Sequence, residues 1–132
     1  NASIIDSRYI SSTENGVVGK KVEFVPNINI KTGIKLGYNN FILNIQYSYL
    51  SKQFTDSSNA IEGNISGVIG QIPSYDILDL SVSYVFKKIK IETGINNLTN
   101  NSYFTRRATG YPGPGIIPSP PINSYLTFQI KL

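Results

Sequence analysis

Apolar and polar side chains alternate along several segments of the chain, and this period-2 pattern constrains the fold more than any other feature. In FILNIQYSYLS (41–51) the odd-numbered residues from 41 to 49 are apolar or aromatic, and most even-numbered residues are small or polar. Successive side chains of a β-strand point to opposite sides, so the pattern predicts a strand with one apolar face. The same alternation recurs at 28–38, 78–86, 89–95 and 125–132, with a weaker sixth strand at 3–10.

The connections between these predicted strands are of two lengths. GYNN (37–40) and FKK (86–88) are tight turns, whereas 11–26, 54–74 and 97–123 are long and rich in Gly, Asn, Ser and Pro. Short and long connections follow each other strictly along the chain. The fold class that we expect is therefore all-β, an antiparallel meander of about six strands, with all short turns at one edge and all long loops at the other.

The composition excludes several function classes. The 132 residues include no Cys and no His, so disulfides, the usual structural zinc sites and His-dependent nucleophilic catalysis are all excluded. The net charge of +4 is mild and the lysines are scattered, which does not favour nucleic-acid binding. We therefore expect a protein that is not an enzyme, with no metal site, no cofactor and no nucleic-acid partner.

Charged side chains in the five clear strands fall on the face opposite to the apolar one. A soluble sheet and a membrane barrel both require this, because a charge on the lipid-facing side of a barrel costs about 2–4 kcal/mol at mid-bilayer. If the sheet is a barrel wall, these residues face the lumen: Lys31, Lys35, Asp79, Lys90 and Glu92.

Aromatic residues on the apolar faces gather near the strand ends, with aliphatic residues between them. Two aromatic bands around an aliphatic belt are typical of outer-membrane barrels, and so are short turns on one side and long loops on the other. We therefore favour a membrane barrel over a soluble sheet. The expected lipid-facing aromatic girdle consists of Tyr38, Phe41, Tyr47, Tyr49, Tyr84 and Phe86.

The last third of the chain resembles a known family. NNLTNNSYFTRRATGYPGPGIIPSPP (96–121), followed by a final strand, is similar to the C-terminal end of TonB-dependent outer-membrane receptors, most closely the ferric-dicitrate type of Bacteroidetes-like bacteria. Other segments resemble successive landmarks of the same family, in order: DSRY (6–9), GKKVEFVP (19–26), QYSYLSKQFTDSSNA (46–60) and IPSYDILDLSVSYVF (72–86).

The resemblance implies that residues 1–132 are the C-terminal portion of a 22-stranded transmembrane β-barrel with a plugged lumen in the bacterial outer membrane. The plug and the segment that engages the inner-membrane energy-coupling protein are N-terminal in the family and would lie outside this chain. The implied partners are a ferric chelate, outer-membrane lipid and lipopolysaccharide, and the barrel-assembly machinery, which reads the C-terminal strand. Two positions depart from the family pattern, Leu132 for the common final Phe and Asn123 for a frequent Arg.

The segment 103–121 holds the candidate ligand-binding residues. Arginine's planar fork suits bidentate binding of carboxylates, such as those of a ferric citrate-like chelate, and aromatic side chains can line the pocket. The prolines at 112, 114, 118, 120 and 121 would stiffen the loop and lower the cost of ordering it on binding. The candidates are Tyr103, Phe104, Arg106, Arg107 and Tyr111.

A structural role for the same segment stays open. The segment could fold back over the rim of the barrel, with its arginines paired to an acid such as Asp76 or to lipopolysaccharide phosphates. Two function classes compete with a ferric-chelate receptor: a receptor of the same kind for haem, cobalamin or a glycan, and a soluble β-barrel or sandwich that binds a lipophile. An adhesive or structural surface protein built of β-hairpins is a further alternative.

Six strands cannot close a barrel, so both outer strands would be unpaired edges. For the chain in isolation we expect a need for detergent, or contacts of its apolar face and edges with a second copy. A soluble lipophile binder would instead be a monodisperse monomer in plain buffer.

Overall fold

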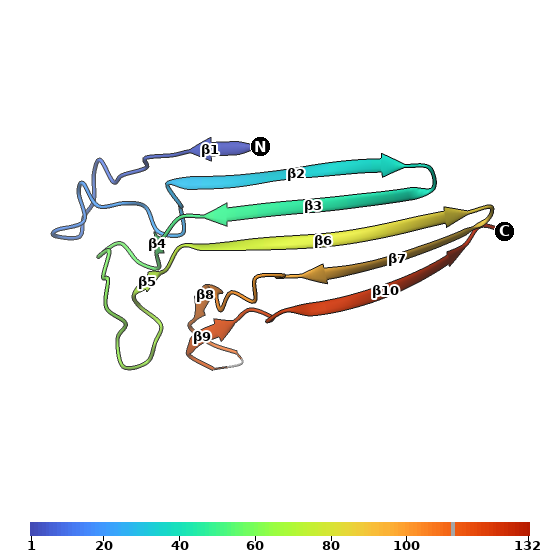
Figure 1. The fold of residues 1–132 in the computed structure, drawn as a ribbon. Helices are drawn as coiled ribbons and strands as arrows, with labels where there is room; N and C mark the ends of the chain where they lie inside the picture. Colours follow the sequence, from blue (N-terminus) through green and yellow to red (C-terminus); the bar gives the residue numbers. More distant parts are fainter. Residues whose placement is uncertain (112) are drawn as a thin grey trace.

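The chain forms one six-stranded antiparallel sheet in a computed structural model that describes residues 1–111 and 113–132 (Figure 1). The strand order is β1-β2-β3-β6-β7-β10, so neighbours in the sheet follow each other along the chain, apart from two short hairpins in the loops. This arrangement confirms the expected fold class. The sheet strands are β1 (Ala2–Ile4), β2 (Ile28–Tyr38), β3 (Phe41–Leu50), β6 (Tyr75–Phe86), β7 (Ile89–Asn96) and β10 (Asn123–Ile130).

Both short turns lie at one end of the sheet and the long loops lie at the other, as expected (Figure 1). Tyr38 pairs with Phe41, and Phe86 pairs with Ile89, so each turn has two central residues. The first central residue has positive φ in both, 50° at Asn39 and 53° at Lys87. A positive φ at this position matches the right-handed twist of the flanking strands.

The long loops contain small sheets that the sequence did not predict. In the second loop β4 (Gln53–Phe54) pairs with β5 (Gln71–Ile72), and in the third loop β8 (Phe104–Ala108) pairs with β9 (Gly115–Pro118). The prolines that argue against a central strand allow this isolated hairpin, because Pro118 is the last residue of an edge strand. Pro112, one of the prolines expected to stiffen the loop, lies outside the described residues.

The largest differences from the expected strand boundaries follow from the partner strands. The first strand ends at Ile4 instead of residue 10, because Ile4 pairs with Ile28, the first residue of β2, and only single contacts follow, such as the Ile5–Asn27 backbone hydrogen bond and the Arg8–Lys21 bridge. The last strand ends at Ile130, which pairs with Ile89 at the start of β7. β6 begins three residues earlier than predicted, at Tyr75, because β3 offers pairing as far as Leu50.

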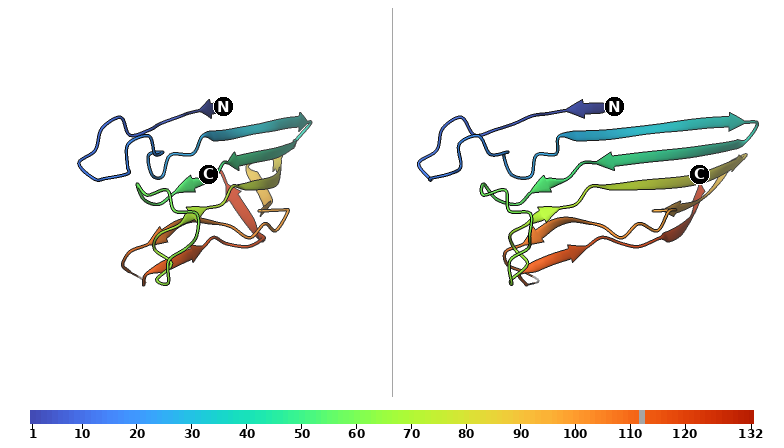
Figure 2. Two further views of the ribbon diagram at one scale, coloured as in Figure 1. Left: turned by 90° about the vertical axis from the view of Figure 1, so that its left-hand side faces the viewer. Right: turned by 60° about the vertical axis from the view of Figure 1, so that its left-hand side comes forward.

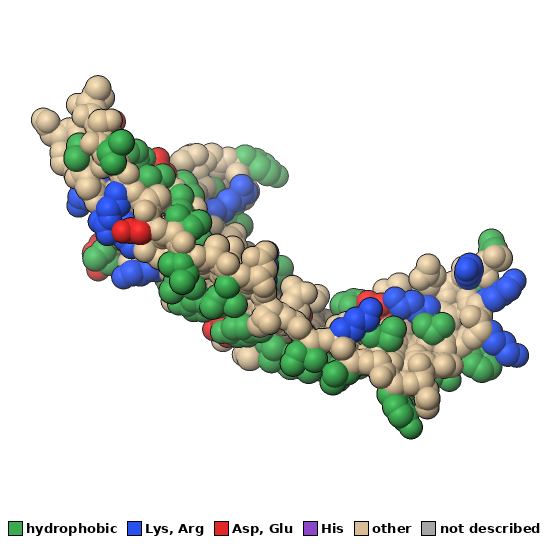
Figure 3. All heavy atoms as spheres, turned by 90° about the horizontal axis from the view of Figure 1, so that it is seen from above, with side chains coloured by type: hydrophobic (Ala, Val, Ile, Leu, Met, Phe, Trp, Pro, Cys, Tyr) green, Lys and Arg blue, Asp and Glu red, His purple; other side chains and the backbone are tan. Residues whose placement is uncertain are grey.

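The sheet is a single curved layer with almost no core (Figure 2). Within the described part of the chain the buried hydrophobic residues are Val17, Ile72 and Ala108, all in the loops. The apolar face is open: Ile34 is 57% exposed and Leu126 is 74% exposed. Hydrophobic side chains follow the length of the sheet in Figure 3. In residues 1–111 and 113–132, no helix is long and apolar enough to cross a membrane.

Candidate functional site

The predicted apolar residues of the strands share one face of the sheet. At the short-turn end the register sets Tyr38 opposite Phe41 and Phe41 opposite Tyr84. The ring centres of Phe41 and Tyr84 are 4.6 Å apart. The row continues through Ile91 to Phe128, an aromatic residue that the sequence analysis did not place in the girdle. The aromatic residues at this end therefore form a row across the sheet that only Ile91 interrupts.

Tyr47 and Tyr49 lie at the loop end of the same face, opposite Leu78 and Asp76 respectively. Asp76 is a correction to the expectation that every strand charge lies on the other face, and it arises because β6 begins at Tyr75. It occupies the outermost row, beyond the aliphatic centre. The orientation of these aromatics toward lipid stays a prediction.

The opposite face carries the five predicted lumen-facing residues, although they do not form one network. Lys90 and Glu92 form an ion pair of 2.7 Å, and the Tyr125 hydroxyl donates to Glu92 at 3.2 Å. The Tyr125 ring lies across Gly94, where an added Cβ would come within 2.5 Å of the ring. Lys35, also on this face, lies opposite Asn44.

Asp79 supports the turn after β7 rather than the ion pair. Its Oδ1 accepts a hydrogen bond of 2.9 Å from the backbone N–H of Asn97. Together with Asn44, Ser81 and Tyr125, among others, it lines a hollow of about 170 Å³ on the polar face. A carboxylate that satisfies a buried backbone donor has a structural role here, and contact with a plug domain remains a prediction.

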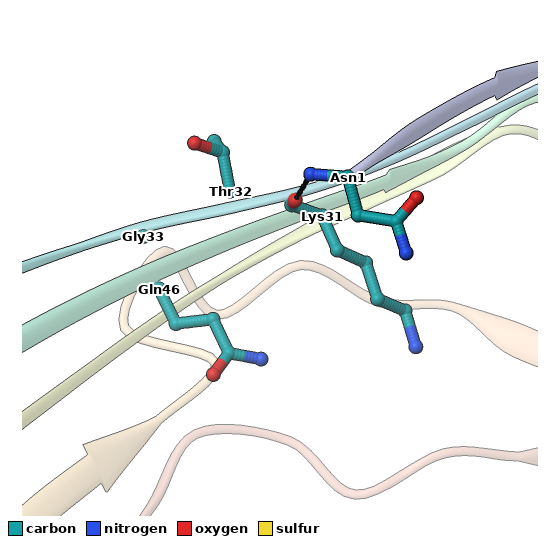
Figure 4. Close-up of a pocket in the computed structure, with 5 residues that line it drawn as sticks. All are labelled: Asn1, Lys31, Thr32, Gly33 and Gln46. Atoms are coloured by element: carbon teal, nitrogen blue, oxygen red, sulfur yellow. Dashed lines mark hydrogen bonds between the residues drawn. The ribbon is translucent and has the colours of Figure 1, made fainter.

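A second and larger hollow, of about 400 Å³, lies at the β1 edge of the polar face. Figure 4 shows Lys31 and Gln46 on the same side of the sheet and Thr32 on the other side. The amino group of Asn1 donates to the Lys31 carbonyl at 2.9 Å. The hollow is open and polar, and its residues suit water or a neighbouring polar surface better than an enclosed ligand.

The two adjacent arginines of the Pro-rich segment have different surroundings. They are consecutive residues of β8, and successive side chains of a strand point to opposite sides. Arg107 is half-buried and donates to the carbonyls of Gly67 (2.9 Å) and Gln71 (3.1 Å), while its guanidinium lies 5.3 Å from the Phe104 ring centre. Arg106 is exposed and makes no hydrogen bond with any described residue. Arg107 therefore ties the third loop to the second, and the Arg106 side chain faces solvent.

Glycines make the slot that holds Arg107. A Cβ added at Gly70 would lie 3.2 Å from Nη2, and one added at Gly63 would lie 3.5 Å from Nη1. The Nε of Arg107 is buried without a hydrogen-bond partner. The suggested pairing of the arginines with Asp76 is wrong: neither ion pair between described residues involves them.

The aromatic candidates of this segment are not gathered into one pocket. Tyr103 stacks on Tyr75 of β6 with 4.7 Å between ring centres, and both line a small hollow of about 50 Å³ with Phe104. Tyr111 is 97% exposed at the tip of the hairpin, close in sequence to exposed Arg106. Ligand binding by these residues stays a prediction, and Arg106 with Tyr111 is the accessible pair.

An asparagine network that the sequence analysis missed fixes the base of this loop. Asn97 is 2% exposed, has φ 52°, and donates from Nδ2 to the carbonyl of Asn101 at 2.9 Å. The Asn101 amide donates back to Oδ1, and the Asn101 side chain donates to the Asp76 carbonyl. Asn100 accepts from the N–H of Ile122. The run of Asn residues was a usable signal, because Asn tolerates positive φ and bonds to nearby backbone.

The first and second loops are also tied together. Asn59, with φ 54°, accepts from the Lys21 amide at 2.7 Å and donates to the Lys21 carbonyl at 2.9 Å, as a paired strand would. In the first loop the Tyr9 hydroxyl donates to Glu23, which raises the pKa of Tyr9. All three long loops are thus joined into one ordered cap at the same end of the sheet.

No cluster of three or more His, Cys, Asp or Glu side chains able to hold a metal ion occurs in the described residues.

No family model matches the sequence. Solved structures do match the fold. The chain resembles the ferric citrate transporter FecA in its unliganded form, with a TM-score of 0.81 and 24% identity over 89% of this chain and 18% of that one. It resembles the ferric yersiniabactin uptake receptor FyuA from Yersinia pestis (TM-score 0.74, 14% identity, 98% of this chain, 20% of that one).

A third match is the siderophore receptor PiuA from Acinetobacter baumannii, with a TM-score of 0.71 and 20% identity over 90% of this chain and 16% of that one. The chain thus spans only 16–20% of the length of these receptors. The six-stranded meander has the fold of a segment of ferric-chelate receptors.

Proposed function

We propose that this chain is the C-terminal portion of the barrel domain of a TonB-dependent receptor, which imports a ferric chelate across the bacterial outer membrane. The chain supplies barrel wall and extracellular loops. The observation that carries the proposal is the unpartnered apolar face of the sheet, which ends in aromatic rows and has the fold of ferric-chelate receptors. The ferric-dicitrate type and the Bacteroidetes-like origin are part of the same proposal.

The exposed apolar face favours a membrane wall over a soluble sheet. Large exposed apolar patches mark interaction surfaces, and here the patch extends over all the long strands. A soluble lipophile binder would enclose such residues, whereas none of the described residues forms a second layer over them. In a membrane wall, Ile34 at mid-strand would lie at the depth of the hydrocarbon core. Tyr38 at the strand end would lie at the depth of the interface, where aromatic residues are common.

The ligand chemistry follows from the two arginines. Arg106 is exposed on the loop cap, and arginine binds carboxylates in bidentate fashion. Arg107 holds the hairpin that presents Arg106 in place. A polycarboxylate such as ferric citrate suits this arrangement. The absence of His in the chain disfavours haem ligation by this segment.

The proposed transport cycle uses the chain as a rigid frame. The loop cap closes on the chelate, a plug domain elsewhere in the receptor rearranges under force from the inner-membrane energy-coupling protein, and the chelate passes along the lumen. The polar face, with Lys31, Lys35 and the Lys90–Glu92 pair, would line that passage.

Titration of the receptor that contains this segment with ferric citrate tests the proposal. We expect saturable binding that Arg106→Ala weakens roughly 10- to 100-fold, since a charged hydrogen bond contributes about 1.5–3 kcal/mol. Arg8→Ala is the matched control, because Arg8 is an exposed arginine of the first loop, paired with Asp6. Absence of binding to ferric citrate would refute the citrate version, and equal effects of both variants would remove Arg106 from the site.

A further inference from the structure

Four lysines gather at the short-turn end of the sheet, away from the loop cap. Lys87 and Lys88 are the central residues of the β6–β7 turn, Lys90 follows in β7, and Lys131 comes directly after β10. All four line one shallow hollow of about 190 Å³. The backbone N–H of Lys131 donates to the Lys88 carbonyl at 2.8 Å, which holds the end of β10 against the turn.

Most of this positive charge is not neutralised by the chain. Lys90 pairs with Glu92, whereas Lys87, Lys88 and Lys131 form no ion pair with any described residue. Lys87 lies 5.4 Å from the ring centre of Phe86. Figure 3 shows basic side chains at this end of the molecule and also at the loop end.

An apolar hollow lies on the other face of the sheet, beside the same turn. It has a volume of about 370 Å³ and lies over the ends of β6, β7 and β10. The lysine hollow is on the polar face with Val85 and Gln129, and Lys87 links the two, because Phe86, over whose ring its ammonium group lies, lines the apolar hollow. The residues that line the apolar hollow are Tyr84, Phe86, Ile89, Ile91 and Phe128.

We propose that this end of the sheet binds one anionic phospholipid. The acyl chain lies in the apolar hollow, and the headgroup phosphate lies against Lys87 and Lys88. The proposal rests on the proposed function for one point only, the contact of the apolar face with lipid. It adds a lipid of defined charge at the inner side of the membrane, at the end opposite to the ligand-facing loops.

The turn lysines next to the apolar hollow favour this occupant over others. A free phosphate ion would use the lysines but leave the apolar hollow exposed, and a neutral lipid would leave three ammonium groups without a counter-charge. A second copy of the chain, packed symmetrically on this end, would bring its own lysines against these, and like charges repel. An anionic phospholipid satisfies both the charge and the apolar surface.

Native mass spectrometry of the receptor that contains this segment, purified in detergent, tests the proposal. Phosphatidylglycerol and phosphatidylcholine with identical acyl chains are titrated separately, and the retained lipid is counted. We expect phosphatidylglycerol to bind more tightly. The Lys87→Gln/Lys88→Gln double variant should lose about fivefold in affinity for each lysine removed. Lys52→Gln, an exposed lysine at the loop end, is the matched control and should leave binding unchanged.

The apolar hollow is tested by Phe128→Ala, which should weaken retention of both lipids, with Leu36→Ala as a control on the same face. Equal binding of the two lipids, an equal loss in the Lys52 control, or displacement by excess inorganic phosphate would overturn the proposal. Ferric citrate binding is measured on the same samples. A lipid preference without chelate binding would support the lipid site while refuting the proposed ligand, so the two failures are distinguishable.

Discussion

Asn97 fixes the start of the long third loop, and its replacement tests how that loop is held. Its side chain makes three contacts: Nδ2 donates to the carbonyls of Asn101 (2.9 Å) and Pro120 (3.4 Å), and Oδ1 accepts from the Asn101 N–H (3.0 Å). The residue is 2% exposed and its φ is 52°. Asn97→Ala removes the contacts and also places an alanine in the left-handed region.

The expected cost can be worked from these contacts. A buried backbone group left without a partner costs about 1–3 kcal/mol, and we take about 1.5 kcal/mol because Asn101 is only half-buried. The left-handed conformation adds about 1–2 kcal/mol for alanine. Together they amount to about 3 kcal/mol of local stability. Asn97→Gly loses the same contacts without the backbone strain, so it should cost about 1 kcal/mol less.

Hydrogen exchange read by mass spectrometry on peptides from 97–123 measures this local stability. If exchange proceeds through local opening, a loss of about 3 kcal/mol speeds it roughly a hundredfold. Asn40→Ala is the control, since Asn40 lies in the β2–β3 turn at the other end of the sheet. Exchange in Asn97→Ala as slow as in the unchanged protein, or no difference between the Ala and Gly variants, would refute this reasoning.

Two further substitutions test cross-strand and inter-loop contacts. Gly94→Ala sets a methyl group within 2.5 Å of the exposed Tyr125 ring, which must move away from Glu92, and should destabilise the sheet by about 0.5–1.5 kcal/mol in denaturant unfolding. Adding Tyr125→Ala should recover most of that loss, and additive costs would contradict the contact. Arg107→Lys keeps the charge but loses the fork that reaches two carbonyls, so exchange in 61–71 should rise, whereas Arg106→Lys should leave it unchanged.

The sheet could be predicted from the sequence because its determinants are local. Alternation sets the face of each residue, and a two-residue turn fixes the register of the strands it joins. The pairing of Tyr38 with Phe41 therefore follows from the sequence and its short turn, whereas the pairing of Phe41 with Tyr84 depends on a register set across the long second loop. The strand ends were less predictable, since Ile4 and Ile130 end their strands where the partner ends.

The contacts across long loops could not be predicted, because nothing local sets them. Tyr125 covers Gly94 only through a register that spans the whole third loop. Arg107 enters a glycine slot some 36–40 residues earlier in the chain. The two arginines were predicted to act together, because the prolines led us to expect a loop without strands. The segment instead forms a short hairpin. Arg106 and Arg107 are consecutive residues of its first strand and therefore have different surroundings.

The central claim is that the apolar face contacts hydrocarbon, and paired spin labels test it most directly. This chain has no Cys, so Ile45→Cys and Gln46→Cys, each placed in a receptor whose other Cys residues have been replaced, give single labels on opposite faces of β3 after reconstitution in liposomes. The account predicts that the label at 45 is accessible to oxygen and shielded from a water-soluble nickel complex. The label at 46, on the other face, should be less accessible to oxygen than the label at 45. A label at 45 that neither reagent reaches would place that face in a dry protein interior and contradict the account.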